Sequence, residues 1–94
     1  MGTTTITSVS GRNSNEDTYV AGTGPANTYV FVTKDGHGGK FGLGPTDGRG
    51  RFNILVGKLP SDIYDWVVCE SSANGVVDES KGYSNKVRQI VDAA

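Results

Sequence analysis

The stretch Thr-Tyr-Val-Phe-Val-Thr-Lys at residues 28–34 decides the fold class. β-Branched and aromatic residues favour extended backbone, and their alternation places the two valines on one face and Tyr29 and Phe31 on the other. Gly-Pro-Ala-Asn precedes the stretch at 24–27, and Lys-Asp-Gly-His-Gly-Gly closes it at 34–39. Both flanks are turn sequences, because glycine accepts positive φ and proline presets its own φ. The stretch is therefore predicted to be a β-strand between two turns.

The same pattern recurs along the chain at the spacing of about 8–12 residues that is typical of sandwiches and barrels. Strands are predicted at residues 3–9, 18–22, 28–34, 40–43, 51–56, 63–70 and 85–91. No helix is predicted, since Gly82 and a β-branched ending interrupt the one charged stretch near the C-terminus. Seven short strands predict an all-β fold, an immunoglobulin-like β-sandwich of two antiparallel sheets.

Composition limits the chain to one small domain and removes several classes of function. The 94 residues include 14 Gly but only 3 Pro, without the Gly period of collagen. Nine Lys and Arg against ten Asp and Glu give a net charge of −1, so no basic excess is present for nucleic acid. No apolar run approaches the roughly 20 residues of a membrane helix. The single Cys69 excludes an internal disulfide.

We expect a single domain over residues 3–92, with 1–2 as an expression start and 93–94 as a tail or the beginning of a linker. No basic and apolar leader follows Met1, so no secretory signal is predicted in this sequence. The isolated domain is expected to be monomeric.

Carboxylates in the turns are the candidate metal ligands, and no catalytic residue is identified. Asp35, Asp47 and Asp62 could offer Ca²⁺ the oxygen ligands that it prefers. No twelve-residue calcium loop is present, however, and Asp-Gly is also a common turn sequence. The lone His37 has no second histidine or nearby cysteine, so zinc is not expected. The sequence therefore predicts calcium as the one candidate ion and no other cofactor.

Aromatic residues divide into a core candidate and candidates for ligand contact. Trp66 shares its predicted face with other apolar residues of a central strand and is expected in the core. Cys69 is expected to be a buried, unreactive thiol, because no base or positive setting can be located for it. Tyr19, Tyr29 and Tyr83 are the better candidates for contact with a ligand.

Residues 18–32, Thr-Tyr-Val-Ala-Gly-Thr-Gly-Pro-Ala-Asn-Thr-Tyr-Val-Phe-Val, resemble the V-x-G-x-x-x-P-G-A-x-V-x-V opening of bacterial Ig-like domains. Further pieces follow in that family's order at residues 35–36, 47–52, 59–66, 71–75 and 84–87. The resemblance implies a tandem module of a bacterial surface adhesin, a secreted protein or a virion. Such a module is extracellular, lacks enzymatic activity and acts as a spacer or stalk whose partners are its neighbouring domains.

Two alternatives stay open beside the spacer. A minority of such domains bind sugars, host proteins or calcium, so the chain could bind a carbohydrate or a host protein through loops at one end. Clustered exposed aromatics would favour that alternative, and scattered polar loops would favour the spacer.

The second alternative is a fragment of a metal-dependent protein phosphatase. Residues 11–17 and 30–39 resemble the G-R-x-x-N-E-D and V-x-D-G-H-G-G motifs that open this enzyme family. That resemblance implies that Asp17 and Asp35 would supply oxygen ligands to two divalent metals that activate water. The family's later metal-binding motifs have no counterpart in this chain, and a glycine-rich hairpin would contain the same residues, so we prefer the reading as turn chemistry.

Overall fold

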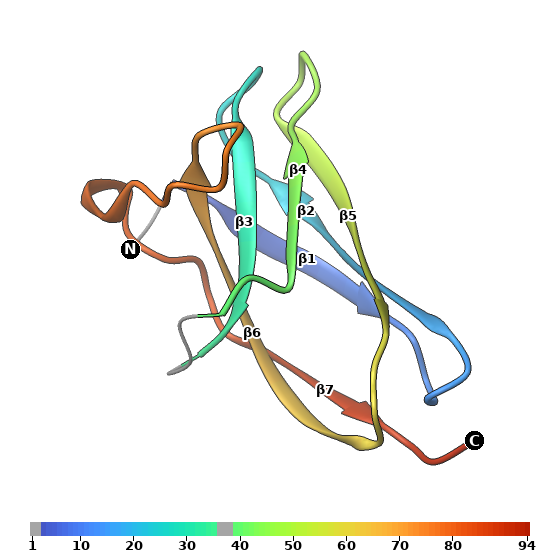
Figure 1. The fold of residues 1–94 in the computed structure, drawn as a ribbon. Coiled ribbons are helices and arrows are strands. Elements are labelled where there is room, and N and C mark those ends of the chain that lie inside the picture. Colours follow the sequence, from blue (N-terminus) through green and yellow to red (C-terminus); the bar gives the residue numbers. More distant parts are fainter. Residues whose placement is uncertain (1–2, 36–38) are drawn as a thin grey trace.

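The fold is an all-β sandwich of seven strands, seen in a computed structural model that describes residues 3–35 and 39–94 (Figure 1). The strands are β1 (Thr5–Ser10), β2 (Asp17–Thr23), β3 (Tyr29–Lys34), β4 (Gly42–Pro45), β5 (Arg51–Lys58), β6 (Asp62–Ser71) and β7 (Val87–Val91). One sheet has the strand order β1-β2-β5 and the other β4-β3-β6-β7, with antiparallel neighbours throughout. The predicted fold class is confirmed.

The connections between strands repeatedly change sheet. The chain crosses from the first sheet to the second between β2 and β3, returns between β4 and β5, and crosses again between β5 and β6. The fourth strand lies beside β3 and not beside β5, so the second sheet has four strands. This order is an immunoglobulin-like Greek key with its fourth strand on the second sheet.

Strand boundaries differ from the prediction by at most two residues. The largest internal shift is at β4, which was predicted at 40–43 and runs over Gly42–Pro45. A second difference is the short 3₁₀ turn η1 (Glu79–Lys81), where no helix was expected. Asp78 caps this turn by accepting a hydrogen bond from the Ser80 backbone N–H, which is a local interaction that favours a turn over a strand.

The core lies between the two sheets and is centred on Trp66. Val20 of the first sheet and Val30, Val32 and Val68 of the second are fully buried with it. The Trp66 ring stacks on the Tyr64 ring with centroids 5.4 Å apart. It also packs edge-on against the Phe41 ring, with centroids 5.2 Å apart. The predicted core position of Trp66 is confirmed.

The outer face of the second sheet is also partly buried, which the alternation of residues did not predict. Phe31 is only 8% exposed and Cys69 is fully buried, although both alternate with core residues. The segment after β6 covers them: a Cβ added to Gly75 would lie 3.9 Å from the Phe31 ring, and the Cys69 thiol contacts the Asp78 carbonyl at 3.4 Å. This segment runs along β6, where the Ser84 N–H donates to the Val68 carbonyl.

Tyr64 forms a corner at the start of β6. Its hydroxyl donates to the Pro60 carbonyl at 2.8 Å, four residues upstream, across the turn from β5. This contact is the tyrosine corner of Greek-key sandwiches, which fixes the turn between the fifth and sixth strands. Burial raises the pKa of the Tyr64 hydroxyl above its ordinary value, so the hydroxyl keeps its proton and remains a hydrogen-bond donor at neutral pH. The Lys34 ammonium lies 4.9 Å from the centre of the same ring.

Replacing Tyr64 by phenylalanine should lower the free energy of unfolding by about 1 kcal/mol, because one hydrogen bond is lost and the Pro60 carbonyl loses its partner. Urea titration followed by Trp66 fluorescence measures the change. The matched control is Tyr19→Phe, which removes a hydroxyl from a side chain that is 39% exposed and should leave stability unchanged. Equal effects of the two substitutions would show that the corner contributes nothing.

Candidate functional site

Asp47, one of the three calcium candidates, acts as a turn former between β4 and β5. Its carboxylate accepts hydrogen bonds from the backbone N–H groups of Arg49 at 2.8 Å and Arg51 at 2.9 Å, and the Arg51 guanidinium lies 3.4 Å away. The Arg51 backbone N–H, followed by that of Arg49, lowers the pKa of the Asp47 carboxyl. Oxygen atoms that would bind a cation are therefore engaged within the turn.

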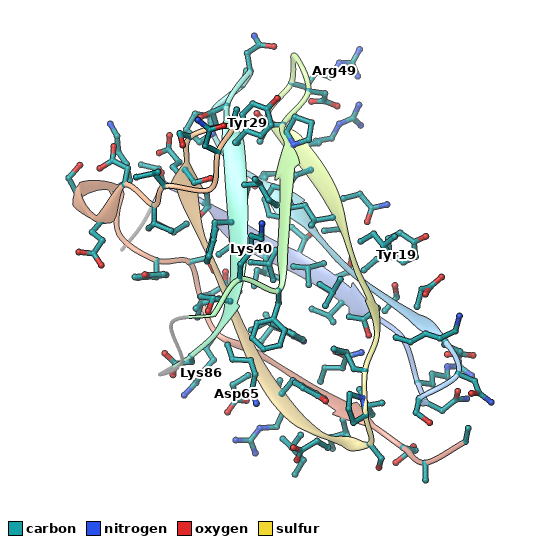
Figure 2. The ribbon with its side chains drawn as sticks, viewed as in Figure 1. Tyr19, Tyr29, Lys40, Arg49, Asp65 and Lys86 are labelled. Atoms are coloured by element: carbon teal, nitrogen blue, oxygen red, sulfur yellow. The ribbon has the colours of Figure 1, made fainter. Side chains whose placement is uncertain are left out.

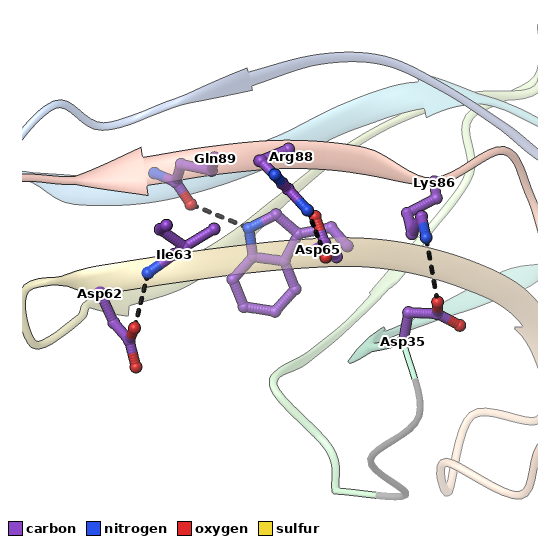
Figure 3. A network of polar contacts seen from close by, with 8 residues as sticks. Asp35, Asp62, Ile63, Asp65, Lys86, Arg88 and Gln89 are labelled. Carbon is purple, nitrogen blue, oxygen red and sulfur yellow. Dashed lines mark hydrogen bonds and ion pairs between the residues drawn. The ribbon is translucent and has the colours of Figure 1, made fainter.

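The other two calcium candidates lie on separate strands of the second sheet. Asp35 follows β3 and its carboxylate pairs with the Lys86 ammonium at 3.6 Å (Figure 3). Asp62 begins β6 and accepts from the backbone N–H of Ile63 at 2.7 Å. The structure does not bring the three predicted ligands together. Across residues 3–35 and 39–94, no three His, Cys, Asp or Glu side chains are grouped so that they could hold a metal ion.

The residues that resemble a phosphatase are also divided between the sheets. Asp17 opens β2 in the first sheet, opposite Lys58 of β5. Asp35 lies past the end of β3 in the second sheet, where its backbone N–H donates to the Asp65 carbonyl. His37 lies outside the described residues. The described part of the chain therefore places Asp17 and Asp35 in different sheets.

One of the three candidate tyrosines lies in the opposite sheet from the other two. Tyr19 is on the outer face of the first sheet, opposite Leu55, and Tyr29 begins β3 in the second sheet (Figure 2). Tyr83 lies between η1 and β7. They are 39%, 36% and 42% exposed, respectively. Tyr19 therefore shares no platform with Tyr29 and Tyr83, because the two sheets of the sandwich separate them.

A hollow of about 400 Å³ opens where β6 ends. It is lined by Thr28, Glu70, Ser71, Ser72, Val76, Val77 and Asp78. Both of its carboxylates have partners, since Thr3 donates its hydroxyl to Glu70 and Ser80 donates to Asp78. Sequence reasoning missed this hollow, because the path of residues 74–84 was left open.

Gln89 carries the most extensive polar contacts in the interior. It faces inward from β7 and is only 6% exposed. Its Oε1 accepts from the Trp66 indole N–H at 2.8 Å, and its Nε2 donates to the Gly11 carbonyl at 2.9 Å and the Thr18 hydroxyl at 3.0 Å (Figure 3). One amide thus joins the second sheet to β2 and to the end of β1. The available signal was a polar residue on the inward face of β7, between the apolar Val87 and Val91.

The first and last strands are tied at two further places. The Asn85 side chain accepts from the Ile6 N–H at 2.9 Å and donates to the Ile6 carbonyl at 3.1 Å, as a neighbouring strand would. Beyond the ends of β1 and β7, the Asp92 backbone bonds to Arg12 and Ser14 at 3.0 Å each. Unpaired strand edges invite association with other chains, and these contacts satisfy part of the β1 edge.

Asp65 and Arg88 form an ion pair across β6 and β7, with Nε and Oδ1 2.9 Å apart (Figure 3). The hydrogen bond from Arg88 lowers the pKa of the Asp65 carboxyl below its ordinary value of 3.8. A carboxyl with a lowered folded-state pKa stabilises the fold above its unfolded pKa, and this contribution disappears as the pH falls through the folded-state value.

We therefore expect part of the loss of stability below pH 3.8 to come from Asp65. Denaturant titrations between neutral pH and pH 2 should give a shallower acid decline for Asp65→Asn than for the unaltered chain. Arg88→Gln should flatten the decline in the same way, because it removes the group that lowers the pKa. Acid profiles that coincide for all three proteins would contradict this assignment.

Searches against protein-family models, curated proteins and solved structures find no significant match to this chain. Within residues 3–35 and 39–94, no helix has the length and apolar character needed to cross a membrane.

Proposed function

We propose that this chain is a non-enzymatic, immunoglobulin-like spacer module of a larger bacterial surface, secreted or virion-associated protein, located outside the cell. The observation that supports it is where the two ends of the chain lie. A spacer holds its neighbours apart only if the chain enters at one end of the domain and leaves at the other.

The two ends lie beyond opposite ends of β1. The Thr3 N–H donates to the Lys81 carbonyl at 3.2 Å, just before β1 begins. Asp92 forms a bridge with Asn13, just after β1 ends. About ten extended residues separate these places, which is roughly 30 Å, and the longest dimension of the molecule is 36 Å. In Figure 1 the beginning of β1 and the C-terminus lie on opposite sides of the fold.

The contacts between the terminal strands also suit a spacer. Gln89, Asn85 and the Asp92 backbone connect the last part of the chain to the first part at three levels. Because these bonds join strands that carry the two ends, tension on the chain ends acts on the folded domain as a whole. The scattered exposed tyrosines agree with the same proposal, since a binding module would gather them.

Spin labels test the geometry on which the proposal depends. With Cys69 replaced by alanine, labels at Thr3→Cys and Asp92→Cys should lie about 30 Å apart. The matched control is Asn13→Cys with Asp92→Cys, which should give a short distance because these residues are bridged. Equally short distances for both pairs would place the chain ends together and contradict the spacer.

A ligand-binding module is the second candidate, and the hollow at the end of β6 is the observation that favours it. Its hydroxyls and small apolar side chains suit a neutral saccharide better than an ion, because both carboxylates are already engaged. Titration with a panel of neutral hexoses, followed by NMR of the Ser72 and Val77 amides, decides between the two. The spacer predicts no saturable shift, and a saturable shift in both amides would establish binding.

A fragment of a metal-dependent phosphatase is the third candidate, and an activity assay distinguishes it from the spacer. The spacer predicts that hydrolysis of a chromogenic phosphate ester with Mn²⁺ stays at the level of the blank. Hydrolysis above the blank that is lost in Asp35→Ala would overturn the proposal of a non-enzymatic module.

A further inference from the structure

The turn after β6 is closed almost entirely by Ser72. The Ser72 N–H donates to the Val76 carbonyl at 3.0 Å, and the Ser72 carbonyl accepts from the Gly75 N–H at 3.0 Å. The Ser72 hydroxyl oxygen also accepts from the N–H groups of Asn74 at 3.2 Å and Val76 at 3.1 Å. The turn lies at the surface, with Asn74 exposed and Val76 69% exposed. Its conformation therefore depends on a few solvent-accessible hydrogen bonds.

Asn74 differs from every other asparagine in the residue that follows it, and from Asn13 and Asn85 in its side-chain contacts. It is the only asparagine that precedes a glycine in the sequence. Glycine has no side chain to hinder approach of its own backbone nitrogen to the preceding amide. In the described part of the chain, no hydrogen bond holds the Asn74 side-chain amide, whereas those of Asn13 and Asn85 are engaged with backbone groups.

We propose that Asn74 is a site of spontaneous deamidation in the folded protein, and that the Ser72 hydrogen bonds set its rate. The Gly75 nitrogen loses its proton and attacks the side-chain amide carbon of Asn74. A carbon–nitrogen bond forms, the bond to the side-chain nitrogen breaks, and ammonia leaves after taking up a proton. The resulting succinimide adds one water and opens to an aspartyl or an isoaspartyl residue. No oxidant or reductant takes part.

The turn must open for this reaction, because the Gly75 N–H is hydrogen-bonded to the Ser72 carbonyl in the closed turn. Hydrogen bonds of an exposed turn open at a free-energy cost well below that of global unfolding. The two bonds accepted by the Ser72 hydroxyl oppose this opening. Conversion is therefore slower than in an unstructured peptide but does not require the domain to unfold.

The Asp47-Gly48 turn has a related sequence, but the Asp47 side chain is not an amide and is held by hydrogen bonds. Its side chain is a carboxylate, which is a poor electrophile when ionised, and the N–H groups of Arg49 and Arg51 hold it in the ionised form. Attack by the glycine nitrogen on the preceding side chain is therefore blocked at Asp47 and available at Asn74. Asn74 and Asp47 both precede a glycine. They differ in the chemistry of the side chain and in the hydrogen bonds that the side chain makes.

Conversion would change the surface beside the hollow. Each product adds one negative charge to a chain of net charge −1, in the turn whose Ser72 and Val76 line the hollow. The isoaspartyl form also lengthens the main chain by one carbon inside the turn, so the bond from Ser72 to Val76 cannot form as before. Since this turn covers Phe31, the modification is expected to loosen the cover over the outer face of the second sheet.

The test incubates the folded protein at pH 8 and separates charge variants, with peptide mass spectrometry assigning the converted residue. We expect an acidic species whose converted residue is Asn74, while the peptides that carry the other asparagines stay unchanged. Asn74→Gln should abolish this species. Ser72→Ala should raise the rate about fivefold, which corresponds to about 1 kcal/mol of turn stabilisation.

Three results would overturn the proposal. Conversion at other asparagines at the same rate would remove the special status of Asn74. An unchanged Asn74 in the folded protein, with conversion only in denaturant, would show that the turn does not open. An unaltered rate in Ser72→Ala, with a circular dichroism spectrum like that of the parent chain, would exclude the control by Ser72. The inference is independent of the spacer function, because it concerns one turn and no neighbouring domain.

Discussion

Replacing Gly22 by alanine should lower the free energy of unfolding by at least about 3 kcal/mol. Gly22 lies in β2 with β1 on one side and β5 on the other. An added Cβ would lie 1.9 Å from the Thr5 carbonyl oxygen and 2.8 Å from the end of the Phe52 ring. The carbonyl belongs to the paired backbone of the neighbouring strand, so it cannot move without breaking the β1–β2 pairing. Strain therefore remains in the folded state.

Gly48→Ala is the matched control for this substitution. Nothing lies within 4 Å of a Cβ added at Gly48, and its backbone does not occupy the left-handed region. Its stability should change by no more than about 1 kcal/mol, and any gain would come from a less flexible unfolded chain. Urea titrations of both variants measure the contrast. A stable Gly22→Ala variant would mean that β1 does not approach β2 as closely as the structure shows.

Replacing Gln89 by methionine should cost about 3 kcal/mol in the free energy of unfolding. Methionine keeps most of the volume but has no amide, so the Trp66 indole N–H and the Gly11 carbonyl lose their partner inside the fold. Buried polar groups left without hydrogen bonds account for costs of this size. The loss should exceed that of Tyr64→Phe, because several partners are orphaned instead of one.

Ile90→Met serves as the control for Gln89→Met. It introduces the same side chain at the next residue of β7, at a position that is 59% exposed, and should change stability by less than about 0.5 kcal/mol. Thermal and urea unfolding of both variants give the comparison. Equal stabilities would show that the amide does not tie the two sheets together.

Local alternation was enough to predict the strands and the centre of the core. The period of two placed Val30 and Val32 on one face of their strand and Trp66 in the core, and the structure buries all three residues. The burial of Cys69 was expected from its residue type and is confirmed, but the same period gave no reason to expect Phe31 to be buried on the other face. Their burial depends on a segment that arrives from far along the chain and lies over the sheet, which no local pattern encodes.

The candidate sites were harder to predict than the strands, because turn sequences and ligand sequences share residues. Asp47 and Asp35 could be chosen as cation ligands from sequence, yet the structure gives each a separate local partner. Gln89 had only one signal, a polar residue at an inward position. Its importance comes from Trp66 and Gly11, which are distant in sequence and meet only in the folded chain.

Small-angle scattering of three copies joined from Ala94 to Thr3 tests the spacer most directly. If each copy receives the chain at one end of β1 and releases it at the other, every added copy should lengthen the particle by about 30 Å, close to the 36 Å long dimension of the single domain. Copies that fold back on one another, with length growing by less than the 22 Å short dimension, would contradict the spacer.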